Sequence, residues 1–184
     1  MYHKGLALMV NFVEYFAFWI FRLMRRLQLH KILHLGVQTR QFSDYFKGME
    51  NSKAVRGIFG KETEAVLRDL KVEFTWIGGY MFVDGTDGRL VINSQYLRTG
   101  DKIDIYLDLV HELYHVKQLR EGRELFDARY EYVDRPTEIE AYRYTVDEAR
   151  RLGLSNERIL LYLKTEWMTE EGLKRLANHV GIDY

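Results

Sequence analysis

Residues 102–120 read KIDIYLDLVHELYHVKQLR, and this stretch predicts the helix around which the rest of the chain is organised. Thr99-Gly100-Asp101 precedes it as a start signal, and Gly122 follows it where a glycine would end a helix. The apolar residues that give the helix a buried side are Leu109, Val110, Leu113 and Val116. A helix with this pattern belongs in the middle of a domain.

The centre of this helix spells H-E-x-x-H, with His111 and His115 as the two histidines. Residues four apart on a helix stand one above the other, so the two imidazoles can converge on one metal ion. Glu112 points beside that ion, where a carboxylate can act as a base on a bound water. The pattern therefore predicts a metal site with a proton acceptor next to it.

Two glutamates further along the chain are candidates for a third metal ligand, which catalytic zinc sites usually require. Glu138 shares a helix face with Ala141 and Tyr142, and the small alanine would allow a close approach to the motif helix. Glu140 has another role available, because Thr137 and Glu140 match the capping-box pattern. We therefore expect Glu138 to be the ligand and keep Glu140 as the alternative.

The segments on either side of the motif helix predict an α+β fold. A helical period covers 61–70, and the turn Asp84-Gly85-Thr86-Asp87-Gly88 predicts a hairpin. Strands are expected at 72–77, 80–83 and 89–92. Helices are expected at 136–152, 156–167 and 170–179, the last two capped by Ser155 and Thr169. We expect a small antiparallel sheet packed on the metal-bearing helix, in an otherwise mostly helical chain.

The N-terminal region has a different character. Residues 6–21 are almost wholly apolar, but the run is shorter than the roughly 20 residues of a spanning helix and contains Asn11 and Glu14. We expect residues 1–36 to form a hydrophobic helix that packs on the protein or lies on a membrane surface, with a true span as a third alternative. Residues 5–35 would then offer a surface for membrane contact or self-association.

The composition excludes several classes of protein. Twenty-seven basic residues balance 27 acidic ones, so no bulk charge favours nucleic acid and none is expected as a partner. The chain has no cysteine, so a transition-metal site must use histidine and carboxylate. The absence of cysteine also suits a protein of the reducing cytoplasm. The protein would associate with a membrane if its N-terminal helix lies on a bilayer.

H-E-x-x-H at His111–His115, followed by E-x-x-A at Glu138–Ala141, resembles the gluzincin branch of zinc metallopeptidases. The resemblance covers roughly residues 70–152 and is closest to the compact, single-domain members. It implies a zincin-like domain over residues 37–184 that ends in a helical pair. It also implies a Zn²⁺ cofactor and a peptide or protein substrate, hydrolysed by a metal-bound water that Glu112 activates. The alternative is a catalytically silent, metal-binding zincin-fold protein that acts as an interaction or regulatory module.

The chain departs from this family at one position. Several gluzincins carry an acidic residue directly after the small residue, oriented toward a ligand histidine, whereas this chain has Tyr142 there. Another residue must then orient the His111 ring, and Asp108, one turn earlier, is a candidate. The alternative is that Asp108 is simply a solvated carboxylate. The tyrosines that could donate to an oxyanion are Tyr130, Tyr132, Tyr142 and Tyr144. Family analogy also suggests that the strand at 89–92 pairs with an extended peptide.

Overall fold

The computed structural model describes residues 39–76 and 79–184, and this part of the chain is mostly helical with one small sheet, which confirms the expected mixture. The hydrophobic helix expected at residues 1–36 lies outside the described residues. No helix of the described part is long and apolar enough to cross a membrane.

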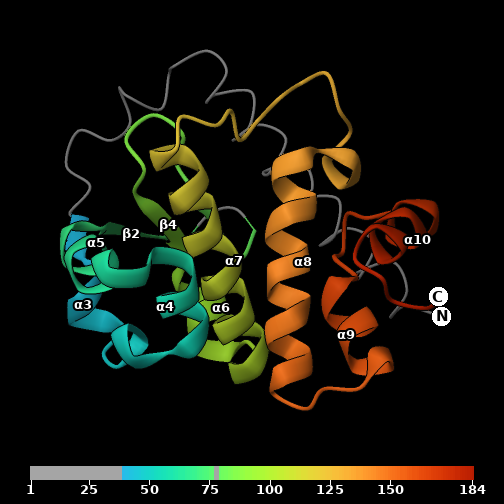
Figure 1. Ribbon diagram of the computed structural model, residues 1–184, viewed down its shortest axis with the longest axis horizontal. Coiled ribbons are helices and arrows are strands. Elements are labelled where there is room, and N and C mark those ends of the chain that lie inside the picture. Colours follow the sequence, from blue (N-terminus) through green and yellow to red (C-terminus); the bar gives the residue numbers. More distant parts are fainter. Residues whose placement is uncertain (1–38, 77–78) are drawn as a thin grey trace, which may run out of the picture.

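Strands and short helices make up the first part of the described chain, and helices alone make up the second (Figure 1). The first part contains β1 (Thr39–Gln41), α3 (Phe42–Tyr45), the 3₁₀ helix η1 (Met49–Asn51), α4 (Lys53–Phe59), η2 (Gly60–Glu62), α5 (Thr63–Asp69), β2 (Lys71–Thr75), β3 (Met81–Val83), β4 (Leu90–Asn93) and α6 (Ser94–Thr99). The second part contains α7 (Lys102–Arg120), η3 (Tyr132–Asp134), α8 (Pro136–Arg151), α9 (Asn156–Leu163) and α10 (Glu170–His179).

The sheet is mixed, so the expected antiparallel sheet is wrong. Its strand order is β1-β2-β4-β3, with β2 and β4 parallel and the other two neighbouring pairs antiparallel. The predicted hairpin is present, because β3 and β4 pair with Val83 opposite Leu90. After β2, however, the chain crosses to the sheet edge to form β3 and then returns between the two as β4. Residue alternation predicts a strand but carries no information about which neighbour it pairs with.

Helix α7 spans Lys102–Arg120, as the sequence predicted. The Asp101 carboxylate caps it by accepting hydrogen bonds from the amides of Ile103 and Asp104. Residues 109–113 are all buried, and five consecutive residues cover more than one full turn. The middle of α7 is therefore enclosed on every side, as in a helix at the centre of a domain.

Two hydrophobic clusters lie on opposite sides of α7. One joins Val110 and Leu113 to the sheet and to α4 and α5. The other joins Leu107 to α8, α9 and α10. In Figure 1, α7 and α8 run side by side, with α9 and α10 beyond α8. The polar residues in the middle of α7 are therefore held between two apolar cores.

The C-terminal helices follow the sequence except at one end. Ser155 and Thr169 cap α9 and α10 by accepting from the amides of Arg158 and Gly172. Helix α9 ends at Leu163, four residues earlier than expected. The chain turns there, and the Trp167 ring lies 5.6 Å from the Tyr80 ring, centroid to centroid. Trp167 thus lies outside α9 and contacts the β2–β3 connection.

Candidate metal centre

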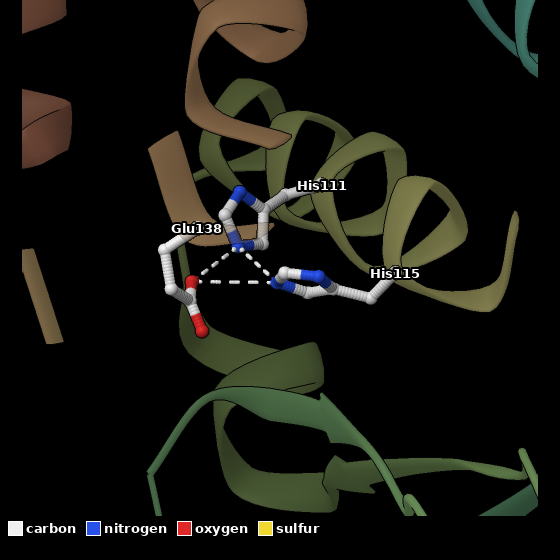
Figure 2. A group of neighbouring side chains, drawn as sticks. All are labelled: His111, His115 and Glu138. Atoms are coloured by element: carbon white, nitrogen blue, oxygen red, sulfur yellow. Dashed lines mark hydrogen bonds and ion pairs between the residues drawn. The ribbon is translucent and has the colours of Figure 1, made fainter. Parts of the chain in front are cut away.

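Three side chains converge in the space between α7 and α8: His111 and His115 from α7 and Glu138 from α8 (Figure 2). The two histidine Nε2 atoms are 3.0 Å apart, and Glu138 Oε2 lies 3.3 Å from each. A tetrahedral zinc ion with bonds of about 2.0–2.2 Å places its ligand atoms about 3.3–3.6 Å apart. The three atoms therefore fit a small tetrahedral ion after slight expansion, with one position left for another ligand.

Local structure explains why these three atoms meet. His111 and His115 are separated by one helical turn, which puts them on the same face of α7. Ala141, one turn after Glu138, is fully buried where α8 packs on α7, and its small side chain allows the two helices to approach closely. Glu138 also lies in the first turn of α8, where the helix dipole favours a negative charge.

The electrostatics of the cluster favour ionised Glu138. Burial alone would raise the pKa of this carboxyl group, but the charge of His115 and hydrogen bonds from both histidines hold its pKa far below the usual range. Burial lowers the pKa of His115, whereas attraction to Glu138 outweighs that effect and raises it to about 9. Burial lowers the pKa of His111. Without a metal, the proton therefore resides on His115, and a bound cation must displace it.

Glu112 lies beside the cluster and accepts a hydrogen bond from the sheet. Its Oε2 accepts a hydrogen bond of 3.0 Å from the Val83 amide, in β3. The side chain is buried, and this burial raises the pKa of Glu112 to about 8. A carboxyl group with such a pKa can take up and release a proton near neutral pH, and a cation nearby would favour its ionised form.

Glu140, the alternative ligand, lies outside the cluster. Its carboxylate accepts two hydrogen bonds of 3.1 Å from Arg123 and one of 3.0 Å from Gln118 Nε2. The expected capping box is wrong, because α8 begins at Pro136 and the Thr137 hydroxyl donates to a backbone carbonyl of another segment. Two glutamates in one helical turn thus have different partners: Glu138 faces the two histidines, whereas Glu140 faces Arg123 and Gln118.

Asp108 does not orient His111. Its carboxylate accepts hydrogen bonds from the hydroxyls of Tyr96, at 2.6 Å, and Tyr162, at 2.9 Å. Burial raises the pKa of Asp108 to about 6 in spite of these bonds. Within the described part of the chain, His111 Nδ1 is buried and has no hydrogen-bond partner. The expected contact is therefore replaced by a separate cluster of one carboxylate and two phenols.

Two of the four candidate tyrosines adjoin the metal cluster. The Tyr142 ring lies against His111, with centroids 4.3 Å apart, and its hydroxyl is 2.8 Å from that of Tyr132. Tyr144 donates instead to the carbonyl oxygen of Ala54, away from the cluster. Tyr130 is 44% exposed. Tyr142 and its partner Tyr132 are therefore the candidate tyrosines that lie next to the cluster.

Two residues near the cluster were not singled out from the sequence. Gln118 Oε1 is 2.7 Å from His115 Nδ1, and its side chain is 1% exposed. Arg135 is also buried, and its Nη1 lies 3.6 Å from Glu138 Oε1. Gln118 could have been found from its spacing, three residues after His115 on one helix. Arg135 could have been found only by placing the start of α8 correctly.

The strand beside the site is β3, not the one expected. Family analogy suggests the segment 89–92 as the peptide-pairing strand, but β4 lies inside the sheet, between β2 and β3. Strand β3 stands at the end of the strand order and packs on α7. The Val83 amide of β3 points to Glu112 and not to β4.

Comparisons with family models, curated proteins and solved structures returned no match to this chain. Function is therefore inferred from the residues of the site.

Proposed function

We propose that the protein is a zinc-dependent metallopeptidase of the gluzincin type, with a zincin-like fold, that hydrolyses peptide bonds. The observation that carries the proposal is the meeting of His111 Nε2, His115 Nε2 and Glu138 Oε2 at separations of 3.0–3.3 Å, with Glu112 next to the first ligand. Two imidazoles and one carboxylate form a common ligand set of catalytic zinc, which keeps a fourth position open.

Zinc bound there would act as a Lewis acid and would make a water in the open position more acidic. Glu112 supplies the proton transfers. Its carboxylate accepts a proton from the attacking water and then delivers it to the nitrogen of the departing amine. The bond from Val83 holds Oε2 of Glu112, so Oε1 would be the oxygen that accepts the proton. A pKa near neutrality suits a group that must both take and give a proton.

Tyr132 and Tyr142 provide the donors for the developing oxyanion. Burial raises the pKa of both phenols well above the ordinary value, so they remain protonated and can donate a hydrogen bond at neutral pH. Their hydroxyls already contact each other at 2.8 Å, so one of them can donate outward while accepting from its neighbour. A donor aimed at the carbonyl oxygen stabilises the transition state more than the ground state.

An extended peptide would bind along β3. This strand is at the end of the strand order, and its Val83 amide is directed at the proposed base. The Val83 amide is already bonded to Glu112, so a substrate backbone would pair with the outer edge of β3 before Val83 and would then pass Glu112 and the metal ligands. This arrangement supports a peptide over a small-molecule substrate, because pairing uses only backbone groups.

The variant Glu112→Gln tests the proposal. It keeps the shape and the Val83 contact but cannot accept a proton, so zinc content should equal that of the wild type while peptide hydrolysis falls about 10²–10⁴-fold. The assay is mass spectrometry of a broad peptide library, with zinc measured by elemental analysis. Glu140→Gln is the matched control and should retain hydrolysis. If zinc-loaded wild type and Glu112→Gln are equally inactive, the peptidase proposal fails and a silent metal-binding module is favoured.

A further inference from the structure

Gln118 connects one proposed metal ligand to the start of the helix that carries another. Its Oε1 is 2.7 Å from His115 Nδ1. Its Nε2 donates to the Thr137 carbonyl oxygen at 3.0 Å and to Glu140 Oε2 at 3.0 Å. The side chain is 1% exposed, so no solvent competes for these bonds. One amide thus joins α7 to the residue directly before Glu138.

The orientation of this amide follows from its partners. The Thr137 carbonyl and the Glu140 carboxylate can only accept hydrogen bonds, so the –NH₂ end of Gln118 must face them. Its carbonyl oxygen must then face His115, and the ring nitrogen in contact with it must carry a proton. Arg123 holds Glu140 in place with two further bonds of 3.1 Å. The direction of every bond in this chain is therefore determined.

We propose that Gln118 is a positioning residue that fixes the tautomer and ring plane of His115, so that its Nε2 lone pair is presented to a metal. This inference rests on the proposed metal centre. A proton fixed on Nδ1 leaves Nε2 as the coordinating atom, and Nε2 is the atom that meets His111 and Glu138. Histidine ligands generally depend on such a partner for their orientation.

The two histidines differ in this respect. His111 Nδ1 has no hydrogen-bond partner in the described part of the chain, and its ring is held by contact with Tyr142. His115 is therefore the ligand whose geometry is fixed by hydrogen bonding, and Gln118 is the residue that fixes it. The bond to Thr137 further couples that geometry to the first turn of α8.

The experiment compares zinc affinity, measured by chelator competition, in four purified full-length proteins. Gln118→Leu removes the acceptor with little change in volume and should weaken zinc binding about 10–100-fold. Gln118→Met removes the same acceptor with an unbranched side chain of similar length and should also weaken zinc binding about 10–100-fold. Gln95→Leu, the same change at an exposed position of α6, is the control and should leave affinity unaltered.

Long-range ¹H–¹⁵N NMR of the zinc-loaded proteins supplies a measurement that a loss of folding stability alone would not change. In the wild type the His115 Nδ1 proton should show the downfield shift of a hydrogen-bonded proton, and this shift should be lost in Gln118→Leu and Gln118→Met. If Gln118→Leu folds and binds zinc as tightly as the wild type, the inference is overturned. If Gln118→Leu does not fold, Gln118→Met decides, and zinc binding there within about threefold of the wild type overturns it. A wild type that binds no zinc refutes the metal centre itself, whereas one that binds zinc but cleaves no peptide refutes only the peptidase proposal.

Discussion

The response of the protein to zinc should depend on Glu138 and not on Glu140. In the wild type, free zinc at 1,000 times Kd should stabilise the folded state by about 4.1 kcal/mol. At roughly 2–4 °C per kcal/mol for a chain of this length, Tm should rise by about 8–16 °C. The ligand atoms already lie 3.0–3.3 Å apart, so little of this stabilisation should be lost to rearrangement.

Glu138→Gln removes the anionic ligand and leaves two histidines. A loss of about 3 kcal/mol, the lower end for breaking a buried charged pair, corresponds to roughly 150-fold weaker binding. At the same zinc concentration the stabilisation would fall to about 1 kcal/mol, and the rise in Tm to about 2–5 °C. Glu140→Gln, the same chemical change two residues later on α8, should keep the full shift.

Without metal, the wild type and Glu138→Gln should differ in folding stability, and this difference should depend on pH. His115 has a pKa of about 9 in the folded protein, above its ordinary value of 6.5, because of Glu138. The pairing therefore stabilises the fold fully below about pH 6.5, and this contribution is lost as pH rises through 9. Metal-free Glu138→Gln should accordingly be less stable than the wild type at pH 6 by about 3 kcal/mol, and the difference should shrink toward pH 9.

Differential scanning calorimetry with and without zinc, at pH 6, 7.5 and 9, measures both effects. The assignment of Glu138 would be refuted by equal zinc shifts in the wild type and Glu138→Gln. It would be reversed if Glu140→Gln alone abolished the shift, because Glu140 would then have to leave Arg123 and reach the histidines.

Two further predictions concern residues around the site. The pKa of Asp108 is about 6 in the folded protein against an ordinary 3.8, so its contribution favours folding below about pH 4 and is lost as pH rises through 6. Asp108→Asn should therefore be more stable than the wild type at pH 7, by up to about 3 kcal/mol in urea denaturation, and a difference independent of pH would contradict this. Ala141→Leu should destabilise the protein by about 1–3 kcal/mol through overpacking and should also weaken zinc binding. Ala149→Leu, equally buried further along α8, should be destabilising without affecting zinc, and calorimetry with a zinc titration separates the two.

The sequence was most informative where structure depends on neighbours along the chain. The limits of α7, the start signal at residues 99–101 and the hairpin of β3 and β4 were all predicted, because caps, turns and helical spacing act over a few residues. The same local geometry places His111 and His115 on one face of α7. The capping box at Thr137 was wrong because Pro136, at the first helical position, starts α8 two residues earlier than that motif requires.

The parts that could not be predicted depend on residues far apart in the chain. Asp108 meets Tyr162 through a contact that spans 54 positions, and nothing in the sequence near Asp108 signals it. The place of β4 between β2 and β3 depends on how the chain crosses the sheet, and residue alternation is the same for either order. Glu138 and Glu140 have similar local surroundings, and only the packing of α8 on α7 separates them.

The sequence by itself therefore determined the helix that carries H-E-x-x-H, the spacing of its two histidines and the place of the glutamate between them, because helical geometry is a property of the local chain. Only the tertiary structure decided that Glu138 meets these histidines, that Glu140 binds Arg123 and Gln118, and that β3 lies beside Glu112. These contacts join α7 to elements that come before and after it in the chain. They are decided by how two hydrophobic cores bring those elements together on either side of α7.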